Sequence, residues 1–360
     1  MALPPGFEAV DFDEFHRRTL PALLSGGRAA LVAGDVATLP SLALRIDDRR
    51  SFTYRPGDGV ISIDPGDERA ATVIAIDVDD WCGLVHELEA PAGLVYGGRI
   101  RAVRGAAADL MAWESTLRAL YTGRPPYRPE ALDLRDRDGR PLDVQRAFDP
   151  AGERADMAHF LATAGYLFVR GVFSADEASR LLSEAIALRA EARPGDKLSW
   201  WGTNAAGEEV LTRVTRANAM PALGALPSDP RVLDLVALAE RPLVHTRGEG
   251  QGVTAIYKQP EMSKSGLSDL PWHRDCGMGG HAVMCPRLLV SIYLREATPE
   301  TGELAMLPGS HRAAFNAHDR GIDPWRHAAR FAARPGDVSL HYGMRRRRRR
   351  PVSRRIASAR

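Results

Sequence analysis

The residues Pro271-Trp272-His273-Arg274-Asp275 decide how the second half of this 360-residue chain is interpreted. His273 and Asp275 are two positions apart, and residues two apart on a β-strand point to the same face. A strand here would therefore present an imidazole nitrogen and a carboxylate to a single point. These groups are two of the three ligands in the 2-His-1-carboxylate triad of non-heme Fe(II) oxygenases. Because a His-x-Asp pair is common by chance, the segments around it must distinguish a metal site from a chance match.

The segments around this motif follow a specific order. Residues 252–260 (GVTAIYKQP) have the composition of a strand before the motif, and residues 287–297 (RLLVSIYLREA) that of a strand after it. A Gly-x-Leu turn and a Pro-Gly-Ser-His loop follow within residues 301–312 (TGELAMLPGSHR). A Gly-Asp strand then begins at residues 336–343 (GDVSLHYG). The combination is far more specific than the motif alone.

The start of the second half is also well marked. Apolar residues at helical spacing, followed by a glycine, predict a helix that ends at Gly165; they are Met157, Phe160, Leu161 and Ala164. Residues 166–172 (YLFVRGV) form a compact apolar strand. Ser174 with Glu177 three residues later is a capping box that predicts the next helix.

From about residue 152 to residue 343, this succession resembles the phytanoyl-CoA dioxygenase family. The resemblance implies a double-stranded β-helix (a jelly roll, cupin-like) with flanking helices, here a domain at residues 151–343. It implies Fe(II) bound by His273 and Asp275, with 2-oxoglutarate as cosubstrate and O2 as oxidant. The implied reaction is hydroxylation of a substrate C–H bond, with decarboxylation of 2-oxoglutarate to succinate and CO2.

The resemblance also suggests contacts to the cosubstrate. Tyr257, Lys258 and Ser291 lie on strands next to the motif and are expected to contact 2-oxoglutarate; the alternative is that they are ordinary strand residues. His311 matches a structural residue of the family rather than a ligand. His281 lies in a glycine-rich loop and is expected at the surface or at the substrate entrance.

The pattern breaks at the last iron-binding element. His341 fills the family's first histidine position on the Gly-Asp strand, but the iron ligand expected five or six residues later falls at Arg346 or Arg347. An arginine stays protonated and has no free lone pair, so it cannot bind iron. The arginine expected to clamp 2-oxoglutarate has no clear counterpart, and residues 345–360 (RRRRRRPVSRRIASAR) lack the pattern of a final strand. The domain is therefore expected to be incomplete at its C-terminus.

Three explanations fit this break. The reading frame shifts near Tyr342 and replaces the natural C-terminus, or His341 itself is the third metal ligand in a modified site, or the domain is a pseudo-enzyme with a basic tail at residues 344–360. We favour the frameshift, because a sudden arginine run follows an otherwise acidic chain. A catalytically impaired pseudo-enzyme or a lipid-binding carrier is the alternative function.

Residues 1–125 show a different pattern. Short strand-like runs separated by turns fill residues 41–76, with helices expected before and after them, a short strand near residues 98–105 and a final helix. This α+β order resembles the sterol-carrier-protein-2-like fold, which implies an apolar tunnel for a lipid, sterol or acyl chain. A helper domain with a filled core is the alternative. His16 and His86 are expected to be surface or capping residues.

Residues 126–150 are rich in Pro, Gly, Asp and Arg and are expected to be a linker. A chain of this length, with this change in composition, predicts two domains. A lipid-carrier domain fused to an oxygenase favours a small hydrophobic substrate, because linkage raises the effective concentration. The oligomeric state stays open.

The charge of the chain is uneven. Residues 345–360 contain nine arginines and no acid; without them 39 Lys and Arg face 46 Asp and Glu, so the overall +2 becomes −7. The run could bind nucleic acid, but no specific nucleic-acid partner is expected. Three cysteines without CxxC spacing predict reduced thiols. With no apolar stretch long enough for a bilayer and no signal-peptide pattern, a cytoplasmic location is expected.

Overall fold

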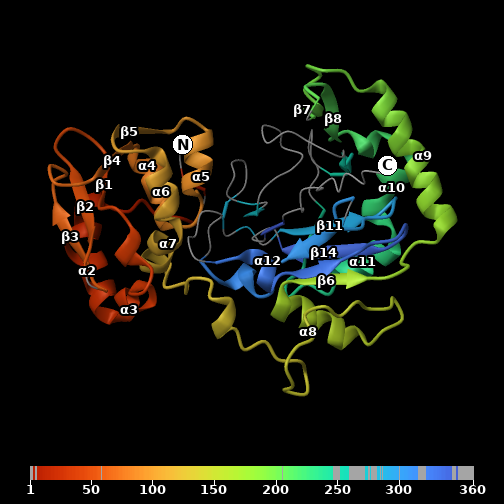
Figure 1. The fold of residues 1–360 in the computed structure, drawn as a ribbon, viewed down its shortest axis with the longest axis horizontal. Coiled ribbons are helices and arrows are strands. Elements are labelled where there is room, and N and C mark those ends of the chain that lie inside the picture. The colour runs from red at the N-terminus through yellow and green to blue at the C-terminus, as the bar shows by residue number, and fades with distance from the viewer. Residues whose placement is uncertain are drawn as a thin grey trace, which may run out of the picture. The chain divides into compact units, whose positions relative to one another are not determined.

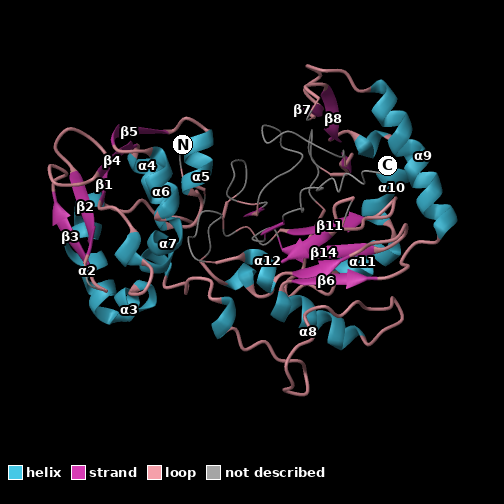
Figure 2. Ribbon diagram, viewed as in Figure 1, coloured by secondary structure: helices cyan, strands magenta, loops and turns pink. Residues whose placement is uncertain are grey.

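The computed structural model describes residues 3–4, 6–57, 59–204, 206–245, 252–258, 272–274, 276, 282–283, 285, 287–299, 301–314, 322–342 and 346–347, with the backbone alone at 273, 274, 346 and 347. The chain divides into two compact units (Figures 1 and 2). Unit 1 comprises Met1–Leu132, Arg274–Pro286 and Ser310–Asp323. Unit 2 comprises Asp133–His273, Arg287–Gly309 and Pro324–Arg360. No helix of the described residues is long and apolar enough to cross a membrane.

Unit 1 contains a five-stranded sheet with the order β3-β2-β1-β4-β5. Its strands are β1 (Leu42–Arg45), β2 (Ser51–Pro56), β3 (Ile61–Pro65), β4 (Thr72–Ile76) and β5 (Ile100–Arg104). One pair of this sheet is parallel, since β4 runs in the same direction as β1. The connection at residues 66–71 carries the chain from β3 past β2 to the far side of β1, where the amide of Thr72 donates to the Ser41 carbonyl at 3.0 Å.

Helices pack against this sheet. They are α1 (Phe12–Glu14), α2 (Leu20–Leu23) and α3 (Ala29–Val32), joined by π-helical turns at Phe15–Thr19 and Leu24–Arg28, and then α4 (Val78–Val85), α5 (Pro91–Tyr96), α6 (Ala107–Ala112) and α7 (Glu114–Thr122). The core is rich in aromatic side chains, including Phe12, Phe52, Tyr54, Trp81 and Trp113. This burial of apolar area is what stabilises the unit.

His16 belongs to that core, so its expected surface position is wrong. Its side chain is 1% exposed and its ring stacks on Phe52 with centroids 4.6 Å apart. His16 follows Phe12 by four positions, which places both residues on the same face of the helical stretch. That face is covered by the sheet, and the histidine is buried with it.

Unit 2 contains several small sheets. The first has the order β11-β14-β6, all antiparallel, from β6 (Tyr166–Val169), β11 (Leu288–Ile292) and β14 (Val338–Tyr342), which lie side by side in Figure 1. The others pair β12 (Leu304–Met306) with β13 (Ala329–Phe331), β10 (His273–Arg274) with β15 (Arg346–Arg347), and β7 (Ser199–Thr203) with β8 (Glu209–Val214) and β9 (Ala255–Ile256).

The helices of unit 2 include the two that the sequence predicts most clearly. The helices of this unit are α8 (Arg154–Ala164), α9 (Ala175–Glu191), α10 (Pro221–Ala225), α11 (Pro230–Val236) and α12 (Pro324–His327). Gly165 ends α8 with φ of +78°, and Ser174 and Glu177 form the reciprocal capping box of α9. Phe148, from the expected linker, is buried in the core of this unit, and its amide donates to the Phe168 carbonyl at 2.8 Å.

Candidate metal and cosubstrate site

The His273-x-Asp275 motif begins on a short strand. His273 is the first residue of β10, while Asp275 lies outside the described residues. The preceding Trp272 is 4% exposed and packs edge-on against Trp325 of α12, with ring centroids 5.3 Å apart. This aromatic contact fixes the chain immediately before β10. The convergence of the His273 and Asp275 side chains stays a prediction.

His341 lies on β14 in the middle of the first sheet. It is fully buried, opposite Leu289 of β11 on one side and Tyr166 of β6 on the other. Because opposed residues in antiparallel strands share a face, Ser291 and its partner Ser339, two pairs further along, lie on the same face as His341. The structure thus places two of the expected site residues, His341 and Ser291, on one sheet face.

This polar face looks toward the β12–β13 pair. Phe168 lies opposite Ser339, and its ring stacks on Phe331 of β13 with centroids 4.8 Å apart and an interplanar angle of 7°. The hydroxyl of Tyr293 lies 3.3 Å from that of Ser339. Tyr293 was not expected in the site. The alternation in SIYLR, which separates Ser291 and Tyr293 by two positions, is the signal that points to it.

Tyr257 and Lys258 each donate a hydrogen bond to a backbone carbonyl group. The Tyr257 hydroxyl donates to the Ala185 carbonyl of α9 at 2.6 Å. Burial raises the pKa of Tyr257 to about 12, although Arg189 acts to lower it, so the phenol stays protonated. The Lys258 ammonium donates to the Gly302 carbonyl just before β12. Both side chains therefore bind protein carbonyl groups in this structure.

The Gly336-Asp337 pair immediately before β14 is required by the local structure. Gly336 has φ of +90°, and a Cβ atom there would collide with the carbonyl oxygen of Phe173. The buried Asp337 carboxylate accepts hydrogen bonds from the amides of Gly171 and Arg334, each at 2.9 Å. It also pairs with the Arg170 guanidinium at 2.7 Å. The pair therefore fixes the entry to the strand that carries His341.

The remaining histidines of interest lie in different environments. His311 is 6% exposed in a 3-10 turn at Ser310–Arg312, and His245 is exposed. His281 lies outside the described residues. Within the part of the chain that the structure describes, no group of three His, Cys, Asp or Glu residues could hold a metal ion.

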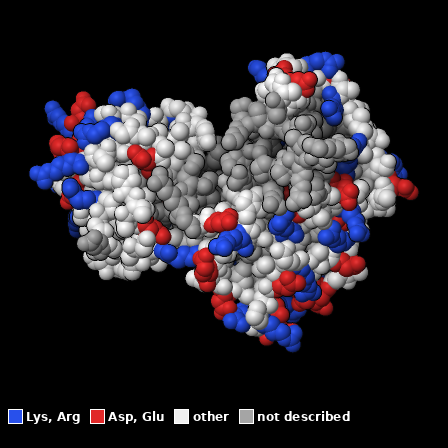
Figure 3. Space-filling model, viewed as in Figure 1, with Lys and Arg blue, Asp and Glu red and all other residues white. Residues whose placement is uncertain are grey.

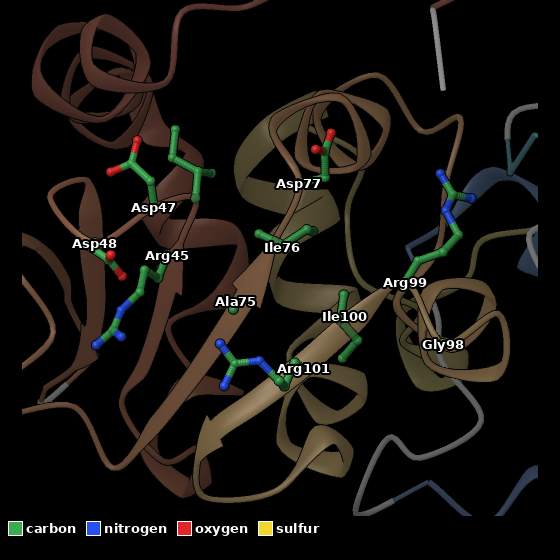
Figure 4. A pocket seen from close by; sticks show the side chains of 11 residues that line it. Arg45, Asp47, Asp48, Ala75, Ile76, Asp77, Gly98, Arg99, Ile100 and Arg101 are labelled. Carbon is green, nitrogen blue, oxygen red and sulfur yellow. The ribbon is translucent and has the colours of Figure 1, made fainter.

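Unit 1 contains a cleft of about 400 Å³ at the carboxyl ends of the parallel strands β1 and β4. Figure 4 shows Asp47 and Asp48 on one side of it and Arg99 on the other. Its lining is charged and partly neutralised, since Arg45 pairs with Asp67 at 2.6 Å and Arg99 pairs with Asp80. This cleft is unlike the apolar tunnel expected for a lipid carrier.

Charged side chains are mixed on the described surface. On the face shown in Figure 3, acidic and basic residues lie next to each other over both units. Neighbouring pairs such as Arg137 with Asp156, 3.2 Å apart, illustrate this. The basic character of the chain therefore rests on its terminal arginine run, as the sequence indicates.

The last iron-binding element departs from the expectation in one respect. A final strand was expected to be absent, but Arg346–Arg347 form the two-residue strand β15, which pairs with β10. His341, in contrast, lies on β14, which pairs with β11 and β6. The arginine run is thus the sheet neighbour of the strand that begins at His273.

Several solved structures are similar to this chain. Similar solved structures include the epimerase SnoN in complex with Fe3+, alpha-ketoglutarate (2-oxoglutarate) and nogalamycin RO, at 20% identity and a TM-score of 0.41, covering 56% of this chain and 78% of that chain. EctD from S. alaskensis with 2-oxoglutarate and 5-hydroxyectoine is similar at 21% identity and a TM-score of 0.40, covering 63% of this chain and 81% of that chain. HygX from Streptomyces hygroscopicus with nickel and 2-oxoglutarate is similar at 20% identity and a TM-score of 0.35, covering 55% and 81%.

Comparison with curated proteins gave no match. The family model described as phytanoyl-CoA dioxygenase (PhyH) matches residues 161–349, which is more than half of the chain. The matched range includes α9, the strand of His273 and the strand of His341. On this match, the chain belongs to the phytanoyl-CoA dioxygenase family.

Proposed function

We propose that unit 2 is an Fe(II)- and 2-oxoglutarate-dependent oxygenase that hydroxylates a C–H bond of a small, lipid-like or acyl substrate. The observation that carries the proposal is the family match over residues 161–349, a range that contains the His273-x-Asp275 motif, whose first residue begins β10. An imidazole and a carboxylate are the donors that a non-heme Fe(II) site uses. When bound, iron and 2-oxoglutarate together supply the activation of O2.

The side chains that the chain offers match the ligand set of an Fe(II) and 2-oxoglutarate site only in part. His273 and Asp275 are the two proposed protein ligands, and Ser291, Tyr257 and Lys258 are the proposed contacts of 2-oxoglutarate. For the third ligand the chain offers two places, His341 on β14 and the arginine positions on β15. Because the third position is not filled by a clear donor, the donor set does not complete a facial triad.

The described strands of unit 2 support a jelly-roll arrangement. The β11-β14-β6 sheet and the β12–β13 pair are both antiparallel, and the stacked rings of Phe168 and Phe331 join them. We propose that the apolar contacts between them form one wall of a dry cavity beside β10. Such a wall would hold an apolar substrate and exclude water from the metal.

For unit 1 we propose a sterol-carrier-protein-2-like domain, with residues 1–125 as the carrier, 126–150 as a linker and 151–343 as the oxygenase domain. The element order supports it: a helical stretch, three strands, a fourth strand, helices, an edge strand and two final helices. Lipid bound after extraction of the purified protein with organic solvent, identified by mass spectrometry, would favour this role.

The oxygenase proposal is tested by anaerobic titration of the purified chain with Fe(II) and 2-oxoglutarate. A weak visible metal-to-ligand charge-transfer band is expected, and His273→Ala should abolish it. His245→Ala, at an exposed histidine of the same unit, is the matched control and should leave the band unchanged. If no variant and no wild-type sample binds metal, and lipid is extracted instead, the carrier function is favoured.

A further inference from the structure

Two arginines with a gap between them line the cleft of unit 1. Arg45 of β1 is opposite Ala75 of β4, and Ala75 is opposite Arg101 of β5. Neighbours across paired strands share a face, so the three residues form a row on one side of the sheet (Figure 4). Leu44 and Ile74, each one position earlier, are buried in the aromatic core, so the row lies on the opposite face. The small side chain of Ala75 leaves the middle of the row open.

Both guanidinium groups of the row have hydrogen-bond donors left over. The Arg45 Nε atom donates to the Asp67 carboxylate at 2.6 Å, which holds the side chain in place. The Nη atoms of Arg45 have no hydrogen-bond partner among the described residues. Arg101 is exposed and makes no ion pair or side-chain hydrogen bond within the part of the chain that the structure describes. Both arginines can therefore donate to a ligand.

The other charged side chains that line the cleft are mostly engaged with protein groups. Asp48 alone among them has no hydrogen-bond partner in the described ranges, and it is exposed, so that solvent screens its charge. The engaged groups are Asp47 with Arg50, Asp77 with the amide of Asp79, and Arg99 with Asp80 and Glu89. The hydrogen-bonding capacity left in the cleft thus belongs chiefly to donors.

The cleft also lies at a favourable place in the fold. After β1 the chain turns back into β2, whereas after β4 it enters α4 on the way to β5, so the two connections leave the parallel pair in opposite directions. Such a divergence opens a crevice outside the carboxyl ends of the strands, where ligands bind in sheets with parallel strands. The volume of about 400 Å³ suits a small molecule.

We propose that this cleft binds a small organic anion, whose carboxylate or phosphate group bridges Arg45 and Arg101 over Ala75. A guanidinium offers two parallel N–H donors to such a group, and hydrogen bonds between oppositely charged groups are stronger than neutral ones. Ile46 and Ile100, which also line the cleft, supply apolar surface for the rest of the ligand. The site is separate from the residues proposed to hold iron and 2-oxoglutarate.

The experiment uses the full chain and three probes that share one ring: phenyl phosphate, benzoate and the neutral benzyl alcohol. Isothermal titration calorimetry at physiological ionic strength measures the affinity for each, and the two anions distinguish a phosphate from a carboxylate ligand. At least one anion should bind, and benzyl alcohol should not. If no probe binds, or if benzyl alcohol binds as tightly as the anions, the proposal is overturned.

Arg101→Gln should weaken binding of the anion at least about tenfold, because a hydrogen bond to a charged group contributes enough free energy for that ratio. This variant is preferred to a change at Arg45, which would leave the buried Asp67 without its partner. Arg69→Gln removes the same charge from an exposed arginine of unit 1 that does not line the cleft, and it should leave the affinity nearly unchanged. An equal loss in both variants would assign the binding to the general positive field and overturn the proposal.

Two further variants test the geometry and the sign of the charge. Ala75→Leu keeps every arginine, including the run at residues 345–350, but fills the middle of the row, so it should abolish binding. Asp48→Asn removes the opposing charge and should tighten binding. Full affinity in Ala75→Leu would place the anion elsewhere, and that result or weaker binding in Asp48→Asn overturns the proposal. Arg101→Gln, at an exposed residue of the edge strand, keeps the test decisive even where Ala75→Leu fails to fold.

Discussion

The Nε2 atom of His16 lies 2.7 Å from the hydroxyl oxygen of Tyr54 inside the aromatic core of unit 1. Its Nδ1 atom lies 2.7 Å from the Phe12 carbonyl, which can only accept, so Nδ1 carries the proton and Nε2 accepts from Tyr54. The Tyr54 hydroxyl is in turn 2.5 Å from that of Tyr121. A neutral imidazole therefore satisfies three buried polar groups in a chain of hydrogen bonds.

This arrangement predicts a loss of stability in mild acid. Burial lowers the pKa of His16 from 6.5 to about 4, although its hydrogen bond with Phe12 acts to raise it. Between these values the unfolded chain binds a proton that the folded chain does not, so stability falls as pH falls. At about 1.4 kcal/mol per pKa unit, the free energy of unfolding should fall by roughly 3 kcal/mol between pH 6.5 and pH 4. Above pH 6.5 this loss is absent, because the histidine is then neutral in both states.

Urea unfolding at pH 7 and pH 5, followed by tryptophan fluorescence, measures this effect. His16→Gln cannot titrate, so the free energy of unfolding of this variant should change less between the two pH values than that of the wild type. His86→Gln, at a half-buried histidine of the same unit whose ring contacts the Glu8 carbonyl at 2.9 Å, is the control and should keep the wild-type pH dependence. Equal pH dependence in wild type and His16→Gln would contradict the assignment.

A second prediction concerns Glu87, the one non-glycine residue with positive φ (+55°) that the described residues contain. Its buried carboxylate accepts from Arg118 at 2.6 Å and from Arg124 at 2.9 Å. Burial raises the pKa of Glu87, but attraction to Arg118 and the bonds from Arg124 outweigh it, and the net pKa is lowered. The pair thus stabilises the fold above the ordinary glutamate range, and the contribution is lost as pH falls.

Removing the Glu87 charge should be costly. Glu87→Gln is expected to destabilise unit 1 by about 3 kcal/mol, because breaking a buried ion pair leaves a buried charge poorly compensated. Glu14→Gln is the matched change at an exposed carboxylate, paired with the exposed Arg18 at 3.2 Å, and should cost about 1 kcal/mol or less. Chemical denaturation at pH 7 compares the two. A similar loss for both would show that burial of Glu87 does not matter.

The N-terminus of α9 gives a third prediction. The Ser174 hydroxyl accepts from the Glu177 amide at 3.2 Å, and the Glu177 carboxylate accepts from the Ser174 amide at 2.8 Å. Ser174→Ala should cost about 1 kcal/mol, the usual contribution of such a cap. Ser183→Ala, on the exposed side of the same helix, should change stability by less than about 0.5 kcal/mol. Thermal unfolding by circular dichroism checks both, and equal effects would contradict the capping argument.

These elements also show what the sequence can predict. The end of α8 at Gly165 and the start of α9 at Ser174 follow from local chemistry, since a left-handed glycine and a capping box act within a few residues. The strands around Ser291 and His341 were likewise predicted, because their alternation and their glycine turns are local signals. The family resemblance added their order.

Long-range pairing is what the sequence leaves open. That β4 lies parallel to β1, and that β15 rather than β14 borders β10, are choices between strands far apart in the chain. Local patterns do not encode such choices, because register and partner are set by the packing of whole faces. The burial of His16 is different: its spacing of four from Phe12 placed it on the apolar face of the helix, and this signal was available.

The turn that leads into β14 requires a glycine at position 336. Gly336 has φ of +90°, and its carbonyl accepts from the Phe173 amide at 3.0 Å while its own amide donates to the Tyr293 carbonyl at 2.8 Å. An alanine Cβ would collide with the Phe173 carbonyl oxygen, part of a backbone that cannot rotate away as a side chain can. Gly336→Ala should therefore destabilise unit 2 by more than about 4 kcal/mol, through backbone strain and overpacking together.

Gly171 is the matched control, because it also has positive φ (+56°) but no atom lies within 4 Å of the position its Cβ would take. Gly171→Ala meets only the cost of the left-handed conformation, about 1–2 kcal/mol. Urea unfolding of both variants separates the two costs, and amide exchange at the strand of His341 reports whether β14 still pairs with β11 and β6. If both alanine variants lower the free energy of unfolding equally, the close approach of Phe173 does not contribute, and Gly336 is required only for its backbone angle.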